Sequence, residues 1–428
     1  MKRRFLAFLL VLPMLAFCDT PITPEQGEEN PGQTEQPSDN PNDKPAVTDT
    51  VTTQDPPATD VVELAPEITN GSVVLACNPN VHKFLTEVTY PDHDYSYTKI
   101  LDYYGGYNGN LGEGETVKSD KPSEYTIRWT ADAAAGDLTL ELSEPTWSMT
   151  ETITAGGYYV NVSNLVPNTH YTYKVTAANG TVMTEGQFDT YGSIHQVYFK
   201  HSVRNSRDLG GWLTYDGKMV KYRMIYRGGR LQSSTISKSG KKAILDEGIK
   251  AQLDIRGESD VNSSATLPEF DFCAPIIATG GDSMLKADGG DKMRQCMQFV
   301  IDCVKEDKPV FFHCSLGRDR TGTLALIILG LLDVVEGDIS KEYEVTYFSP
   351  RGWSIATSET YTKFQNYRTK WAYAPAANHI WDNYVAEGER FSAGVEKYLL
   401  EIGISQEDIN TFRELMLVEA YPDLTPAE

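Results

Sequence analysis

The sequence is poor in basic residues, in clustered cysteines and in long apolar runs. Acidic residues outnumber basic ones by 22, which argues against nucleic acid as the main partner, because phosphate-backbone binders need a basic surface. The six cysteines are Cys18, Cys77, Cys273, Cys296, Cys303 and Cys314; their spacing forms no metal-type cluster and demands no disulfide. The only long apolar run lies near the N-terminus and is shorter than the roughly 20 residues of a membrane-spanning helix. No motif indicates a cofactor or a metal.

Residues 1–18 are typical of an export signal. A charged start, Met1–Arg4, precedes the apolar run Phe5–Phe17, and Cys18 follows. The end of this run resembles a bacterial lipoprotein signal, in which the cysteine becomes the lipidated first residue, although Phe17 stands where that pattern prefers a small residue. We therefore expect export to the bacterial cell envelope, with a lipid anchor at Cys18 as the membrane contact. The alternative is an ordinary cleaved signal and a secreted protein.

Residues 19–63 have the composition of a linker. They contain eleven acidic residues but a single basic one, Lys44, and almost no large apolar side chains before Val61. Such a segment cannot bury enough surface to offset the entropy of ordering it. We expect a disordered acidic tether that is rich in Pro and Thr.

Residues 64–190 are predicted to form an all-β sandwich domain. Runs such as 138–142, 158–162 and 171–175 alternate apolar and polar residues and are rich in β-branched and aromatic types. The segment 165–175 resembles the late-strand signature of fibronectin type III-like domains. The region shows no constellation of His, Asp and Glu that would form an active site. It is therefore interpreted as a binding or spacer module with an unidentified partner.

Residues 191–428 are predicted to form an α/β domain with a mostly parallel sheet flanked by helices. Helix-like spacing of apolar residues appears at 236–247, 291–305, 321–332, 339–347, 391–402 and 406–417. Short apolar runs at 249–255 and 308–313 separate these stretches and are expected to be strands. Cys314 comes directly after the second run, where a strand leads into a helix and where ligands bind in such folds.

The segment from Cys314 to Thr321 has the residue types needed for phosphate chemistry. A loop of five residues between Cys314 and Arg320 can turn successive backbone N–H groups inward and form an anion cradle. The same groups favour the thiolate, which makes Cys314 a nucleophile. Arg320 can hold two phosphoryl oxygens with its planar fork, and Gly317 allows a tight turn. The hydroxyl of Thr321 would lie near the sulfur.

This segment resembles the phosphate-binding loop of the cysteine-based protein tyrosine and dual-specificity phosphatases. It is most similar to their bacterial and fungal branch, whose loop reads His-Cys-x-x-Gly-Lys-Asp-Arg-Thr-Gly, with Arg318 here in place of the lysine. Residues 205–211, 226–231 and 253–256 match further elements of that branch. The resemblance implies that Cys314, Arg320 and Asp319 are catalytic, and that Ser315, Leu316, Gly317, Arg318 and Thr321 bind the phosphate.

The general acid is left open between the loop and a second segment. In this branch the loop aspartate has been assigned that role, which by resemblance points to Asp319. The wider superfamily uses an aspartate roughly thirty residues before the cysteine, and Asp282 and Asp288 lie at that distance.

His313 is expected to orient Cys314. The residues expected to support the site are Asp208, Asp254, Arg207, Arg230 and Arg256.

We therefore predict hydrolysis of phosphomonoesters through a phosphocysteine intermediate, without a metal. The predicted substrates are phosphotyrosine proteins or phosphoinositides, with an inositol polyphosphate as an alternative. A different class of function is an envelope binding module that carries an inactive phosphatase domain. The intact Cys314, Gly317 and Arg320 argue against that second possibility.

Overall fold

The computed structural model describes residues 65–68, 71–75, 79–95, 99–103, 122, 124–192, 194–200, 202–286, 288–348 and 366–421. The predicted export signal, 1–18, and the predicted linker, 19–63, lie outside these residues. Within the described parts, no helix is long and apolar enough to cross a bilayer.

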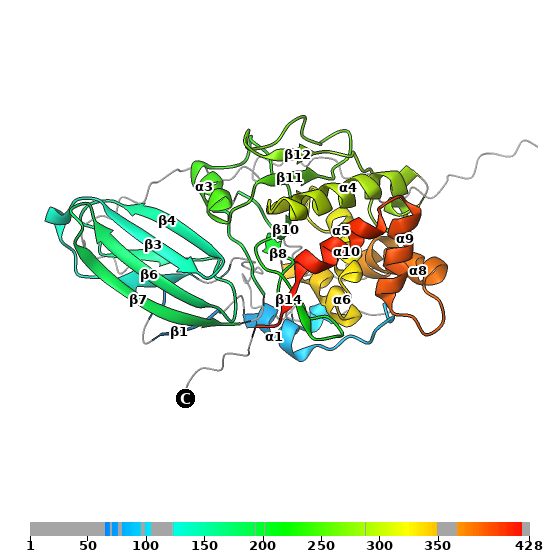
Figure 1. Ribbon diagram of the computed structural model, residues 1–428, viewed down its shortest axis with the longest axis horizontal. Coiled ribbons are helices and arrows are strands. Elements are labelled where there is room, and N and C mark those ends of the chain that lie inside the picture. Colours follow the sequence, from blue (N-terminus) through cyan, green and yellow to red (C-terminus); the bar gives the residue numbers. More distant parts are fainter. Residues whose placement is uncertain are drawn as a thin grey trace, which may run out of the picture. The chain divides into compact units, whose positions relative to one another are not determined.

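A strand-rich region between residues 72 and 191 contains two sheets (Figure 1). The five-stranded sheet has the order β1-β7-β6-β3-β4, and the other pairs β2 with β5. The strands are β1 (Ser72–Val74), β2 (Tyr125–Arg128), β3 (Leu138–Glu144), β4 (Trp147–Ile153), β5 (Tyr159–Val162), β6 (His170–Ala177) and β7 (Val182–Tyr191), with a short helix η2 (Ala133–Ala135) between β2 and β3.

Both sheets of the strand-rich region share one hydrophobic core. Leu138, Leu140 and Leu142 occupy alternate positions of β3 and are buried, as period-two alternation requires for one face of a sheet. They belong to the same cluster as Ile127 of β2 and Val160 of β5. The alternating runs noted in the sequence therefore lie in strands that bury one face.

Two helices interrupt the range predicted for the sandwich domain. α1 (Pro79–Glu87) and α2 (Ile100–Tyr103) carry Val81, Phe84 and Ile100 into the hydrophobic core of the C-terminal region rather than that of the strands. The predicted boundaries of 64–190 thus differ from the observed packing. The apolar residues of 81–88 recur at helical spacing, so they do not fit the alternation expected of a strand.

The C-terminal region contains a five-stranded sheet of order β12-β11-β13-β10-β8. The strands β10 (Ile225–Gly228), β11 (Ala251–Asp254), β12 (Asp271–Cys273) and β13 (Val310–His313) are parallel, and the two-residue edge strand β8 (Arg207–Asp208) is antiparallel to β10. A separate pair joins β9 (Lys218–Val220) to β14 (Leu417–Glu419).

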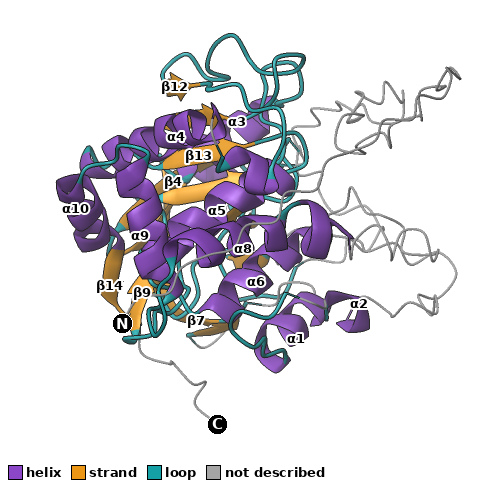
Figure 2. Ribbon diagram, turned by 90° about the vertical axis from the view of Figure 1, so that its right-hand side faces the viewer, coloured by secondary structure: helices purple, strands orange, loops and turns teal. Residues whose placement is uncertain are grey.

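Helices surround this sheet (Figure 2). They are α3 (Lys238–Asp246), α4 (Asp288–Lys305), α5 (Asp319–Leu331), α6 (Glu336–Glu344), α8 (Tyr373–Tyr384), α9 (Phe391–Glu401) and α10 (Gln406–Met416), with the short helices η3 (Gly281–Met284), η4 (Val345–Phe348) and η5 (Tyr367–Trp371). Both α4 and α5 pack against β13. The predicted α/β class with a mostly parallel sheet is confirmed for this region.

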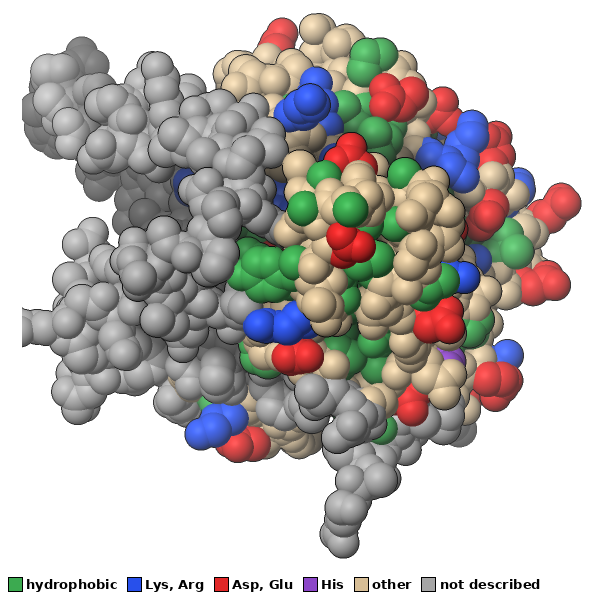
Figure 3. Space-filling model, turned by 90° about the vertical axis from the view of Figure 1, so that its left-hand side faces the viewer, with side chains coloured by type: hydrophobic (Ala, Val, Ile, Leu, Met, Phe, Trp, Pro, Cys, Tyr) green, Lys and Arg blue, Asp and Glu red, His purple; other side chains and the backbone are tan. Residues whose placement is uncertain are grey.

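Charged side chains are mixed on the face of the molecule shown in Figure 3. Lysine and arginine side chains there alternate with aspartate and glutamate, and the described residues form no continuous basic patch on that face.

Candidate active site

Cys314 lies at the end of a central strand. β13 is hydrogen-bonded to β11 on one side and to β10 on the other, and all four of its residues are buried. A strand that is covered on both faces needs a continuous apolar run, which Val310–Phe312 supplies. The chain then turns through residues 314–318 into α5. Cys314 therefore lies at the carboxyl edge of parallel strands and is only 3% exposed.

Gly317 allows this loop to pass close to the neighbouring segment 226–231. Its φ is +70°, a conformation that side chains disfavour. A Cβ at this position would lie 2.4 Å from the carbonyl carbon of Gly228. Any larger residue would push the loop away from the end of β10.

Two carbonyl groups of the loop are bound from outside. The side-chain amide of Asn205 donates to the Gly317 oxygen at 2.9 Å and to the Leu316 oxygen at 3.2 Å. Arg227 Nη2 donates to the same Gly317 oxygen at 2.6 Å. Both donors come from segments more than 80 residues upstream in the chain, so only the tertiary fold brings them to the loop.

These bonds determine which way the loop amides point. The Ser315 oxygen is bound as well, by the backbone N–H of Arg230 at 3.2 Å. In a trans peptide the N–H and C=O point in opposite directions, so the N–H groups of residues 316–318 are directed away from these donors. Successive N–H groups that point to one side form a concavity that binds anions.

A buried carboxylate lies beneath the loop between two arginines. Glu342 accepts from Arg207 Nε at 2.7 Å and from Arg227 Nη1 at 2.5 Å. Burial, followed by the neighbouring Arg207, lowers the pKa of Arg227 to about 10, while Glu342 and the sulfur of Cys314 act in the opposite direction. Two guanidinium groups thus share one carboxylate, which leaves one positive charge in excess beside Cys314.

The two arginines of the loop have different partners. Arg320 donates from Nη1 to the Ile277 oxygen at 3.0 Å. Arg318 makes two bonds to its neighbour Asp319, from Nε to Oδ1 at 2.9 Å and from Nη2 to Oδ2 at 3.0 Å. Among the described residues, the buried Thr321 Oγ1 has no hydrogen-bond partner. A buried hydroxyl without a partner is uncommon and is available to a group bound in the loop.

His313 is held in one tautomer beneath Cys314. Its Nδ1 lies 3.3 Å from the Cys314 oxygen, which can only accept, and its Nε2 lies 2.9 Å from the amide nitrogen of Gln252, which can only donate. Burial, with a smaller effect of Arg256, lowers the pKa of His313 to about 4. The ring is therefore neutral at neutral pH and positions the peptide of Cys314.

Asp254 and Arg256 form a pair at the end of β11. Arg256 donates to Asp254 from Nε at 2.9 Å and from Nη2 at 2.7 Å, and the backbone N–H of Asn262 adds a third bond. Burial alone would raise the pKa of Asp254, but these bonds and the nearby His313 hold it below its ordinary value. The pair anchors both ends of the loop that follows β11.

Comparison with known proteins assigns this sequence to a family. A sequence profile described as the tyrosine phosphatase family matches residues 200–278 and 277–418, which together make up just over half of the 428 residues. The chain belongs to the tyrosine phosphatase family. The predicted relationship to the tyrosine phosphatase superfamily is thereby confirmed.

Individual relatives of this tyrosine phosphatase family member are distant. A protein of Cupriavidus necator that carries the name tyrosine-protein phosphatase is 26% identical over 172 residues, which are 35% of this chain and 62% of the relative. The chain thus spans less than two thirds of that relative's length.

Solved structures with related folds are more distant still. Pseudomonas aeruginosa TpbA in complex with phosphotyrosine is 11% identical, with a TM-score of 0.27, over 48% of this chain and 99% of TpbA. The catalytic core of the Saccharomyces cerevisiae PP-IP phosphatase SIW14 is 14% identical, with a TM-score of 0.22, over 34% of this chain and 82% of the core. Both TM-scores are under 0.5.

The aspartates predicted as acids of this phosphatase family member have different surroundings. Asp319 begins α5 and is held by the fork of Arg318. Asp282 lies in η3 and pairs with Lys286 at 2.5 Å, with both side chains more than a third exposed. Asp288 begins α4, but its side chain is outside the described part. The contacts thus differ in kind and do not single out one acid.

Two carboxylates that hold the family loop from other parts of the chain were not indicated by the sequence, whereas Arg207 and Arg230 were expected to support the site. Asp260 accepts from Ser315 Oγ at 2.6 Å and lies 3.4 Å from Arg230 Nη2. Glu342, described above, was also missed. Asp260 follows the end of β11 by six residues, and its position at the carboxyl edge of the sheet was the available signal. Glu342 lies on α6, which the sequence marks only as an amphipathic helix.

Proposed function

We propose that this protein hydrolyses phosphomonoesters through a phosphocysteine intermediate on Cys314. The observation that carries the proposal is the loop itself. Its carbonyl groups are tied to Asn205, Arg227 and the backbone of Arg230, so its N–H groups face the other way. Such a loop at a helix N-terminus can hold a phosphoryl group next to the sulfur.

The reaction proceeds in two steps. The Cys314 thiolate attacks phosphorus, the S–P bond forms as the ester P–O bond breaks, and a carboxylic acid protonates the leaving oxygen. We assign this acid to Asp319 first, with Asp282 and Asp288 as the alternatives. Water then attacks phosphorus, inorganic phosphate leaves, and the thiolate is restored. Arg320 and the loop N–H groups neutralise the charge that develops on the phosphoryl oxygens.

The proposed phosphate-binding set is the one implied by the sequence, namely Ser315, Leu316, Gly317, Arg318 and Thr321. Leu316, Gly317 and Arg318 supply N–H groups, and the unpartnered hydroxyl of Thr321 is suited to stabilise the sulfur as phosphate leaves. Arg318 takes part through its backbone, because its side chain is buried against Asp319.

We propose phosphotyrosine proteins or phosphoinositides as the substrates. Among the arginines near the loop, Arg207 and Arg318 are buried and paired with carboxylates, and Arg230 is 32% exposed and lies 3.4 Å from Asp260. An inositol polyphosphate is the alternative substrate. Dual-specificity activity would require the pocket to accept aliphatic phosphoesters as well.

Turnover of p-nitrophenyl phosphate by purified protein, with and without a chelator, tests the proposed chemistry. The wild-type chain is expected to be active in both conditions, and Cys314→Ser is expected to lose activity to the level of the uncatalysed reaction. Activity that survives in Cys314→Ser would mean that another residue is the nucleophile. No turnover in the reduced wild-type protein would favour a binding module with an inactive phosphatase domain.

We also propose that the strand-rich region is a fibronectin type III-like module. Its best support is the side chain of Tyr171, whose hydroxyl accepts from the backbone N–H of Val166 at 2.9 Å, the contact of a tyrosine corner. From the sequence alone, we further propose export to the cell envelope with a lipid anchor at Cys18. Labelling with a fatty-acid probe, compared with Cys18→Ala, would test the anchor.

A further inference from the structure

We propose that the strand-rich region is a positioning element for the phosphate-binding loop. The two are linked through the short ribbon of β8 and β10. The consequence for turnover rests on the phosphatase function proposed above, whereas the consequence for the order of the loop does not.

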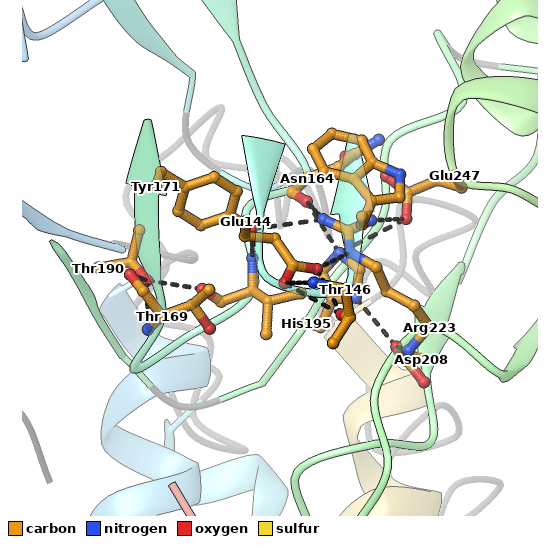
Figure 4. A network of polar contacts seen from close by, with 12 residues as sticks. Glu144, Thr146, Asn164, Thr169, Tyr171, Thr190, His195, Asp208, Arg223 and Glu247 are labelled. Carbon is orange, nitrogen blue, oxygen red and sulfur yellow. Dashed lines mark hydrogen bonds and ion pairs between the residues drawn. The ribbon is translucent and has the colours of Figure 1, made fainter. Parts of the chain in front are cut away.

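The link begins at Arg223, whose guanidinium is buried between the strand-rich and C-terminal regions (Figure 4). Its Nη1 pairs with Glu247 of the C-terminal region at 2.7 Å, and its Nε faces Glu144 of β3 at 3.4 Å. The ring of Trp147 on β4 lies 3.9 Å from the guanidinium carbon. Desolvated contacts of an arginine with carboxylates and an indole face are among the stronger polar contacts in proteins.

Further bonds surround the same arginine. Its Nη2 donates to the Asn164 oxygen at 3.2 Å and to the Tyr171 hydroxyl at 3.3 Å. His195 Nε2 lies 2.9 Å from that Asn164 oxygen, and its Nδ1 lies 3.1 Å from Asp208 Oδ2. We call Glu144, Trp147, Asn164, Tyr171, His195, Asp208, Arg223 and Glu247 the interdomain cluster. It joins strands of one region to the ribbon of the other.

The two faces of the ribbon contact different clusters. On one face, Asp208 of β8 is paired with Tyr226 of β10. Asp208 Oδ2 accepts from the Arg223 N–H at 2.5 Å, and the Tyr226 hydroxyl donates to Glu247 at 3.0 Å, so this face belongs to the interdomain cluster. The neighbouring pair, Arg207 with Arg227, points to the other face. Successive side chains of a strand alternate between faces, so one ribbon serves both clusters.

The loop-facing pair holds the phosphate-binding loop. Arg227 donates directly to the Gly317 oxygen. Arg207 Nη1 donates at 2.5 Å to the side-chain oxygen of Asn205, whose amide group binds the Leu316 and Gly317 oxygens. The loop is therefore held by side chains whose strands are fixed from behind by the interdomain cluster.

The ribbon is held by side-chain contacts as well as by short backbone pairing. β8 has two residues and lies at the edge of the sheet beside β10. On its other side, the Asp208 N–H donates to the His195 oxygen at 3.0 Å and the Val197 N–H donates to the Ser206 oxygen at 3.2 Å, so part of this backbone support comes from His195, a member of the interdomain cluster. Loosening the interdomain cluster is therefore expected to loosen Arg207, Asn205 and the loop.

Hydrogen–deuterium exchange of the full-length protein tests this link without relying on activity. Trp147→Ala removes the ring over Arg223 and the bond from its Nε1 to the Asp246 oxygen, which is 2.6 Å long. Trp147→Phe keeps a ring at that place. Thr150→Ala is the matched control, since Thr150 is exposed on the same strand.

We expect faster exchange in peptides that cover 313–322 for Trp147→Ala, and exchange like that of the wild type for Trp147→Phe and Thr150→Ala. Turnover of p-nitrophenyl phosphate should fall about 2- to 30-fold in Trp147→Ala, the range expected for coupling between distant sites. Faster exchange confined to the interface peptides, with the loop and turnover unchanged, would overturn the proposal.

If Trp147→Ala does not fold, Glu144→Gln provides a second test of the same link. This substitution keeps the shape of the side chain and removes its charge from Arg223, and exchange is measured in the same peptides. A wild-type protein without Cys314-dependent turnover would refute the proposed function. The exchange at 313–322 would still decide whether the strand-rich region positions the loop.

Discussion

Beneath the phosphate-binding loop, Arg207 and Arg227 share the single carboxylate of Glu342, whereas in the interdomain cluster the single Arg223 lies between Glu144 and Glu247. The loop cluster therefore has an excess of positive charge, and the interdomain cluster has an excess of negative charge around its arginine. Both are buried, so the difference is not one of exposure.

The pKa values of the arginines follow this difference. Burial and the neighbouring Arg207 lower the pKa of Arg227 to about 10. Burial also acts to lower the pKa of Arg223, but Glu247 and the surrounding tyrosines outweigh it and raise that pKa. An incompletely compensated buried charge is costly to a folded protein. At the loop the uncompensated charge is positive, which suits a bound anion, whereas in the interdomain cluster it is negative and surrounds an arginine that is already paired.

The largest expected effect comes from removing the shared carboxylate. Glu342→Gln would leave two buried guanidinium groups side by side, and we expect it to lower the free energy of unfolding by about 3–5 kcal/mol. Urea denaturation monitored by circular dichroism measures this change. Turnover should fall as well, because Arg227 and Asn205 would no longer hold the loop.

The matched variant is Glu247→Gln in the interdomain cluster. Arg223 keeps Glu144 as a counter-charge, so the expected cost is smaller, at about 2 kcal/mol for a lost bond to a charged group. Equal losses in the two variants would contradict the difference in charge balance between the two clusters.

A second prediction concerns acid stability on the loop side. The folded pKa of His313 is about 4, below its ordinary value of 6.5. The unfolded chain therefore takes up a proton that the folded chain refuses, so the stability present above pH 6.5 is lost as the pH falls to about 4. At about 1.4 kcal/mol for each pH unit, this loss approaches about 3 kcal/mol.

His313→Gln lacks this titration but can still accept a bond from Gln252. Urea denaturation at several pH values between 4 and 7 should show a wild-type stability that falls relative to the variant as the pH decreases. Parallel curves for the two proteins would show that His313 takes up a proton in the folded state as readily as in the unfolded chain, against the effect expected from its burial.

The smallest effect is expected from Arg318→Lys. A lysine can keep one of the two bonds to Asp319 and the positive charge, but not the planar fork. We expect kcat/KM for p-nitrophenyl phosphate to fall by less than about tenfold, which corresponds to about 1.4 kcal/mol. Arg223→Lys is the comparison, because that guanidinium contacts five partners and a lysine cannot replace it. A larger loss in Arg318→Lys than in Arg223→Lys would reverse the ranking.

Much of the candidate site could be read from the sequence because it is local. Cys314, Gly317 and Arg320 lie within seven consecutive residues, and a strand before them with a helix after them defines the loop. The α/β class likewise followed from the alternation of apolar runs and helical spacing. Motifs of this kind act through neighbouring backbone groups, whose positions depend on few distant contacts.

The carboxylates that support the loop could not be predicted in the same way. Glu342 lies 135 residues after Arg207 and 115 after Arg227, and no local pattern distinguishes it from other acidic residues of α6. Asp260 is one of many acidic residues in loops. The helices α1 and α2 were missed as part of the C-terminal core because their partner faces lie on distant segments.

The sequence by itself determined the proposed nucleophile, the loop proposed to bind phosphate and the type of sheet that presents them, because short-range spacing and periodicity encode these features. Only the tertiary structure decided which arginines face the loop and which are neutralised elsewhere. The ribbon of β8 and β10, which connects the strand-rich region to the loop, likewise forms only in the tertiary structure. The reason is physical: the charge balance of a buried cluster depends on side chains that become neighbours only when the chain has folded.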